Sequence, residues 1–233
     1  MLKLLPILLP LIYGYIIYRF SVRNTLKELD ANSTELADPA FQPVLERLAA
    51  ALGIPRVRVH LYEIEPVNGL AAPDGRIFIT RGFYDKFRSN EVSAEELASV
   101  IAHELGHVAL GHSRRRMIDF SSQNAMRMAL GAVLSRFIPV IGFWLANFAT
   151  SLLAARLSRS DEYEADEYAA ALMTKAGFGV TPQIELFHKL ETLTGAVAGR
   201  PPAWLLSHPK TEERIAAIRA LESRWQVAVN ALS

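Results

Sequence analysis

Apolar side chains are concentrated in two parts of the chain. The first is the segment LLPILLPLIYGYIIY, from Leu4 to Tyr18, and the second extends through residues 117–157. Outside these two segments, apolar positions recur mostly at the spacing of an amphipathic helix. This spacing predicts helices over 41–54, 93–112, 160–177, 182–195 and 211–229.

Alternation replaces the helical spacing in one region only. Residues 56–64 alternate apolar and polar side chains, 76–80 form a short β-branched and aromatic run, and the turn-rich 68–75 lies between them. We expect these residues to form a small hairpin or part of a small sheet, with no β-structure elsewhere. The predicted fold class is mainly α (α+β).

The first apolar segment predicts a membrane anchor. It follows Lys3, and its tyrosines gather toward its C-terminal end, as at a membrane interface. It is slightly short of a standard span, and a signal peptide begins in the same way. No small-x-small cleavage site follows, however. We therefore expect an uncleaved single-pass anchor over 1–22 and a domain over 23–233. The basic residues that follow the apolar segment favour a cytoplasmic location for this domain.

Composition excludes several kinds of chemistry. Lysine and arginine number 25 against 24 aspartate and glutamate, so the charge balance gives no reason to expect a nucleic-acid partner. The absence of cysteine from all 233 residues excludes disulfides, a thiol nucleophile and cysteine-ligated metals. A metal site in this chain must therefore use histidine, aspartate or glutamate.

The segment IAHELGHVAL, residues 101–110, contains such a candidate site. On a helix, residues four apart lie about 40° from each other around the axis, so His103 and His107 share a face and can reach one ion. Zinc takes imidazole nitrogen in this arrangement and activates a water molecule. Glu104 can then accept the proton of that water as general base. The alternative is a core helix with two hydrogen-bonded histidines.

A zinc hydrolase of this kind needs a third protein ligand. His112 lies five residues past His107, about 140° around a continuing helix, which favours a surface or structural histidine. A glutamate from a later helix is the alternative, and SRSDEYEADEY supplies candidates. Glu162 and Asp166 share a helix face, so one can bind zinc while the other accepts a hydrogen bond from a ligand histidine. Spacing alone does not separate Glu162 from Glu164.

Four ordered motifs resemble one protein family. HELGH, SRSDEYEAD, SHPKTEERIAAI and NGLAAPDGRIFITRG together resemble the HtpX-like zinc metalloproteases, a gluzincin group with membrane CaaX prenyl proteases and mitochondrial Oma-type proteases. The resemblance covers roughly residues 40–222. It implies a zincin-like helical domain with one Zn²⁺ per chain. In this family pattern Glu162 is the third ligand, and Asp166 supports a ligand histidine.

The resemblance also implies roles that spacing does not reveal. His208 and Arg214 match residues near the zinc, where either can stabilise the oxyanion formed when water adds to a peptide carbonyl. The segment that begins at Asn68 resembles an edge strand, with which an extended peptide can pair. Asn68 and Ala71 are therefore candidate substrate contacts.

The metal site constrains the second apolar segment. His107 and Glu162 must meet at one ion, so the chain between them crosses a membrane an even number of times. A second span would have to include residues from 117 to 135, where charged side chains such as Arg127 oppose insertion. We therefore favour a helical pair that packs on the domain or dips into the bilayer surface. A transmembrane hairpin, as the HtpX-type resemblance implies, is the alternative.

The sequence thus predicts a membrane-anchored zinc endopeptidase with polypeptide substrates and no nucleic-acid partner. Cleavage of membrane or misfolded proteins in quality control is the favoured role, because a single anchor lacks the multi-span chamber that a prenylated peptide would need. A non-proteolytic, chaperone-like binding protein on the same zinc scaffold is the alternative from another class.

Overall fold

The computed structural model describes residues 5–112, 115, 159–193, 208 and 211–232. The second apolar segment, 117–157, therefore lies outside the described residues. The labelled elements are α1 (Leu5–Ala31), β1 (Ser33–Glu35), α2 (Gln42–Leu52), β2 (Val59–Tyr62), β3 (Gly69–Ala71), β4 (Ile77–Thr80), α3 (Arg81–Arg88), α4 (Ala94–Ala109), α7 (Thr181–Leu193) and α9 (Thr211–Leu232). A further helix covers 159–175. The mainly helical fold with a small sheet is confirmed.

The sheet has four strands in the order β1-β2-β4-β3. Strands β2 and β4 are the two that were predicted, β2 from alternation and β4 from the β-branched and aromatic run, but they pair in parallel, with Val59 opposite Ile77. The hairpin is formed instead by β3 and β4, with Gly69 opposite Ile79. The turn-rich segment thus contains an edge strand. The expectation of no further β-structure was wrong, because β1 adds an antiparallel strand at the other edge.

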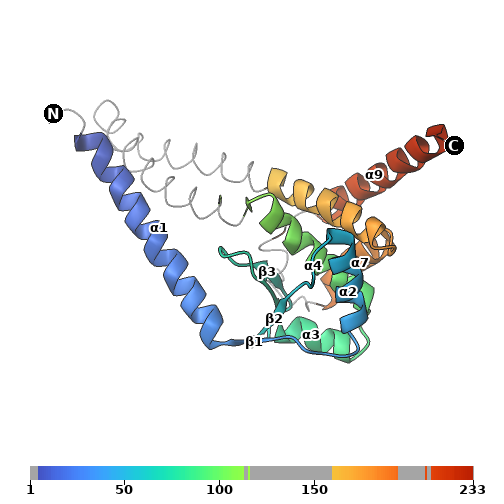
Figure 1. Cartoon of the computed structure of the whole chain (residues 1–233), viewed down its shortest axis with the longest axis horizontal. Helices are drawn as coiled ribbons and strands as arrows, with labels where there is room; N and C mark the ends of the chain where they lie inside the picture. Colours follow the sequence, from blue (N-terminus) through green and yellow to red (C-terminus); the bar gives the residue numbers. More distant parts are fainter. Residues whose placement is uncertain (1–4, 113–114, 116–158, 194–207, 209–210, 233) are drawn as a thin grey trace.

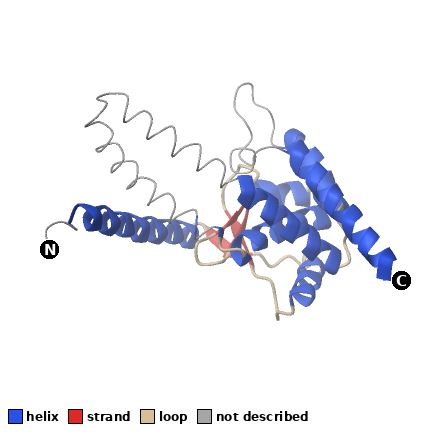
Figure 2. Ribbon diagram, turned by 90° about the horizontal axis from the view of Figure 1, so that it is seen from above, coloured by secondary structure: helices blue, strands red, loops and turns tan. Residues whose placement is uncertain are grey.

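The two faces of the sheet pack against different parts of the chain. Val59 and Ile79 belong to the main hydrophobic core, together with residues of α2, α4 and α7; these helices and the sheet form the body of the molecule. Phe78 points to the opposite face and packs with Leu29 near the end of α1. Figure 2 shows the same division, with most helices on one side of the strands and α1 leaving on the other. The sheet thus forms one wall of the helical body.

Helix α1 extends away from that body (Figure 1). Large apolar side chains on it are exposed, from 51% for Tyr13 to 63% for Phe20. Among the described residues, no helix combines the length and the apolar composition needed to cross a membrane.

Helix α4 is fixed at both ends by local contacts. At its start, Ser93 Oγ accepts a hydrogen bond from Glu96 N, and Glu96 Oε2 accepts one from Ser93 N, which is the predicted capping box. Lys189 of α7 binds the same carboxylate at 2.7 Å. At its other end the helix stops at Ala109, and Gly111 has a left-handed φ of 71°. The helix is therefore shorter than predicted.

Candidate metal centre

Helix α4 presents both histidines of the HELGH motif on one buried face. The Nε2 atoms of His103 and His107 are 3.1 Å apart, and their rings are almost perpendicular. Both side chains are at most 3% exposed. Two ring nitrogens at this distance repel each other unless a proton or a metal ion lies between them. The pair is therefore arranged to share a cation.

Gly106 allows a second helix to approach these histidines. A Cβ atom at Gly106 would lie 3.1 Å from the Cα and carbonyl oxygen of Ala165 and 3.2 Å from the Cβ of Tyr168. A side chain at this position would force its neighbours apart by a few tenths of an ångström, so glycine lets the helix over 159–175 come this close to α4. This contact explains why a glycine is accepted in the middle of a helix.

The close approach brings Glu162 to the histidine pair. Its carboxylate oxygens lie 3.4 Å from His103 Nε2 and 3.5 Å from His107 Nε2, and the residue is 1% exposed. Glu164, which spacing left as an alternative, has a side chain that is 49% exposed and contacts His112 instead. Of the two glutamates, the fold therefore brings Glu162 to the centre.

His208 completes a group of four donors. Its Nδ1 lies 2.5 Å from Glu162 Oε2, and its Nε2 lies 3.7 Å from Glu104 Oε1. One donor atom from each of His103, His107, Glu162 and His208 lies within 4.8 Å of the other three, and all four residues are buried. Imidazole nitrogen together with carboxylate oxygen is a donor set that zinc accepts, so the residues present fit this metal.

Asp166 connects the centre to a buried arginine. Its Oδ1 lies 3.0 Å from Nδ1 of His103, on the side of the ring away from the cluster. Arg214 donates two hydrogen bonds to the same carboxylate, at 2.6 and 2.7 Å, and lies 3.5 Å from Glu162. Gln183 of α7 donates a further one, at 3.4 Å. The guanidinium of Arg214 is thus directed mainly at carboxylates.

The charges of these groups follow from burial and contact. Burial would lower the pKa of His103, but hydrogen bonds with Asp166 and Glu162 raise it to about 9. Burial lowers the pKa of His208 to about 4, although Glu162 opposes this change. The pKa values of both carboxyls lie below their usual range despite burial, because histidines contact Glu162 and Arg214 contacts Asp166. The two ionised carboxylates therefore favour positive charge in this buried site.

Glu104 lies between the histidines and the edge of the sheet. The residue is 2% exposed. A Cβ built on Gly69 would lie 3.5 Å from its Cγ and Oε1, so β3 passes directly beside this carboxylate. Asn68 precedes β3 and Ala71 ends it, which brings both candidate substrate contacts to the same edge.

Two residues that shape the site, Gly106 and His112, were not among the predicted site residues. Gly106 stands inside the motif, but its role depends on a helix some sixty residues later. His112, expected as a surface or structural histidine, is fully buried, and its Nδ1 lies 2.9 Å from Nδ1 of His107. The angle of 140° assumed a continuing helix, whereas α4 ends at Ala109 and the chain turns at Gly111. A glycine just after the motif was the signal for this turn.

Comparison with known proteins agrees with this geometry. The model of peptidase family M48 matches residues 35–222. Metalloprotease LoiP of Escherichia coli is 31% identical over 198 residues, which cover 83% of this chain and 75% of that protein. A Protease HtpX homolog of Dictyoglomus thermophilum is 26% identical, covering 81% and 71%. The human mitochondrial metalloendopeptidase OMA1 is 22% identical, covering 67% and 30%. The chain therefore belongs to peptidase family M48, as the HtpX-like resemblance predicted, and is a metalloendopeptidase.

Proposed function

We propose that His103, His107 and Glu162 hold a single Zn²⁺ with which this endopeptidase hydrolyses peptide bonds. One observation carries the proposal: two imidazole nitrogens and a carboxylate converge within 3.5 Å of one another in a buried site. When bound there, zinc lowers the pKa of a water molecule to near neutrality and polarises a carbonyl oxygen. The chain's own residues supply the remaining steps.

Glu104 is the proposed general base. Its carboxylate accepts a proton from the attacking water and later donates it to the leaving amine. Its position beside both His208 and β3 supports this role, because a peptide held along β3 would bring its carbonyl group to the same place.

His208 and Arg214 have different proposed roles. A catalytic zinc site keeps one position open, so we assign His208 to the neighbourhood of the oxyanion rather than to the ligands. Arg214 acts as a positioning residue, since its hydrogen bonds to Asp166 fix the carboxylate that holds His103.

The outer edge of β3, the last strand of the sheet among the described residues, is the proposed binding site of the substrate backbone. In an antiparallel pair, alternate residues direct their N–H and C=O groups at the partner strand. Thr80 N donates to Asn68 O, and Ala72 N donates to Arg76 O, so the even-numbered residues of this strand face β4. The backbone groups of Gly69 and Ala71 then point outward. An extended peptide can pair with them beside Glu104.

Membrane association and quality control are also proposed. The apolar segment within 1–22 lies in α1, whose large apolar side chains are exposed. An anchor there favours membrane or misfolded polypeptides as substrates, and the flanking basic residues favour the cytoplasmic side.

Zinc content and cleavage test the ligand assignment together. We expect a chelator to abolish cleavage of an unfolded test protein by the full chain, and added zinc to restore it. Glu162→Gln should bind zinc more weakly by at least about tenfold, because it removes a ligand. Glu167→Gln, an exposed change on the same helix, is the control. Full zinc content and full cleavage in Glu162→Gln would contradict the assignment.

A further inference from the structure

His112 lies against the ligand histidine that Asp166 does not contact. Helix α4 ends at Ala109, and Gly111, with φ 71°, turns the chain back. The imidazole of His112 is fully buried, and its ring centroid lies 5.1 Å from that of His107. The two Nδ1 atoms are 2.9 Å apart, which is a hydrogen-bond distance.

A single assignment of protons satisfies the contacts of both rings. To bind a metal through Nε2, His107 must carry its proton on Nδ1. That N–H then donates to Nδ1 of His112, which must be unprotonated. His112 therefore carries its proton on Nε2, which faces carboxylates: Glu164 Oε2 at 3.3 Å and Asp161 Oδ1 at 3.8 Å.

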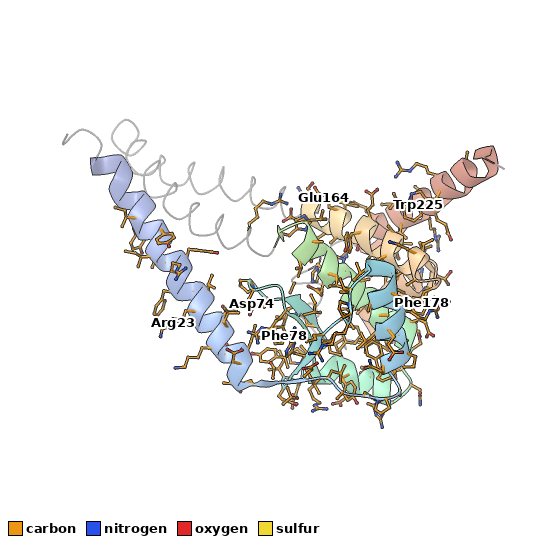
Figure 3. The ribbon with its side chains drawn as sticks, in the orientation of Figure 1. Arg23, Asp74, Phe78, Glu164, Phe178 and Trp225 are labelled. Atoms are coloured by element: carbon orange, nitrogen blue, oxygen red, sulfur yellow. The ribbon has the colours of Figure 1, made fainter. Side chains whose placement is uncertain are left out.

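The carboxylates beside His112 are themselves held in place. Ser160 Oγ donates to Glu164 at 3.2 Å, and Arg115 forms an ion pair with Asp161. Figure 3 shows Glu164 near the start of the helix over 159–175, beside the C-terminal end of α4. The contacts thus run from the metal centre through His107 and His112 to a carboxylate at the surface.

We propose that His112 is a positioning residue for the metal centre. Its Nδ1 accepts the outer N–H of His107 and thereby fixes the tautomer and ring orientation that direct Nε2 at the metal. Glu164 orients His112 in turn. Each ligand histidine then has its own acceptor, Asp166 for His103 and His112 for His107. This inference rests on the proposed zinc site.

The affinity of the full-length protein for Zn²⁺, measured by competition with a chelator, tests this role. His112→Leu removes the acceptor and should weaken zinc binding about 10- to 100-fold. His112→Asn keeps an oxygen at the place of Nδ1, so its affinity should stay close to that of the wild type. Glu164→Ala should weaken binding less than His112→Leu. His188→Asn, which changes an exposed histidine of α7, is the matched control and should have no effect.

The melting temperature of each metal-free variant separates positioning from folding. If His112 positions His107, His112→Asn should bind zinc more tightly than His112→Leu although the metal-free forms of both variants melt at the same temperature. A purely structural histidine would not produce this difference in affinity. Should His112→Leu fail to fold, tight binding by His112→Asn with weaker binding by Glu164→Ala still supports the positioning role. Full zinc affinity in His112→Leu, or affinity in a folded His112→Asn as low as in His112→Leu, would overturn it. A wild type without zinc would overturn the proposed function as well.

Discussion

Arg214 grips Asp166 through two parallel hydrogen bonds, from Nε to Oδ2 at 2.6 Å and from Nη2 to Oδ1 at 2.7 Å. Both residues are at most 2% exposed. The same Oδ1 lies 3.0 Å from His103 Nδ1, so the ion pair sets the direction of a proposed zinc ligand. This buried ion pair therefore contributes both to the stability of the fold and to the geometry of the proposed zinc site.

Removal of the guanidinium should damage stability and metal binding together. Arg214→Met leaves a buried carboxylate without its charge partner, which should cost about 3–5 kcal/mol of unfolding free energy. Zinc affinity should fall as well. Arg214→Lys should rescue these losses only in part, because an ammonium cannot form the paired hydrogen bonds. Urea unfolding and chelator competition measure both effects. Arg219→Met, exposed on the same helix, is the control, and equal losses there would contradict the account.

Gly106→Ala tests the close approach of the two site helices. Alanine alone would favour a helix by roughly 0.5–1 kcal/mol. The new Cβ, however, would meet the backbone of Ala165, which cannot move without moving Glu162. We expect zinc binding to weaken and the free energy of unfolding to fall by about 1–3 kcal/mol. Ala109→Ser, exposed on α4, serves as the comparison. A Gly106→Ala variant that is more stable and binds zinc as the wild type does would show that the metal site does not depend on this close contact.

Ala71→Pro tests the edge strand. Proline removes one outward N–H group, which the substrate backbone is proposed to use, and leaves the hydrogen bonds to β4 in place. KM for an extended peptide should therefore rise while zinc content stays at the wild-type level. Leu70→Pro, whose N–H faces β4, should instead lower the stability of the fold. Unchanged cleavage kinetics in a folded Ala71→Pro variant would place the substrate elsewhere.

Asp38 gives the fold a defined dependence on pH. Its pKa is lowered, chiefly because the hydroxyl of Tyr84 donates to it at 2.7 Å, with Arg88 also in contact. A lowered pKa stabilises the folded state above the ordinary carboxyl value, and this contribution disappears as pH falls through the lowered value. Asp38→Asn should therefore destabilise the protein more at pH 7 than at pH 3. Urea unfolding at both pH values measures the difference, and a constant difference would count against the assignment.

The sequence predicted the positions of helices and strands better than it predicted which strands pair and in which direction. Alternation identified β2, because side-chain period alone defines a half-buried strand, whereas a β-branched and aromatic run identified β4, which is buried along its whole length. Neither pattern carries information on strand direction, so the parallel pairing of Val59 with Ile77 was missed. Strand β1 has only three residues, too few for a visible pattern. The capping box at Ser93, in contrast, is local and was predicted correctly.

The candidate site shows the same limit. His103 and His107 share a helix face because of local geometry, so their proximity follows from spacing alone. Contacts between residues far apart in the sequence cannot be predicted from spacing. The ion pair of Arg214 with Asp166, for example, joins residues 48 positions apart. The contact of His112 with His107 was not predicted, because the end of α4 at Ala109 was not foreseen.

The most direct test of the account is Glu104→Gln. The side chain keeps its size and loses the ability to accept a proton, so cleavage of an unfolded test protein should fall by about 10²- to 10⁴-fold. Glu95→Gln on the same helix is the control and should cleave at the wild-type rate. Zinc content, determined in the same preparations, should remain one ion per chain in all three proteins. Full activity in Glu104→Gln would contradict the mechanism, and zinc-loaded wild type without cleavage would favour a binding protein on this scaffold.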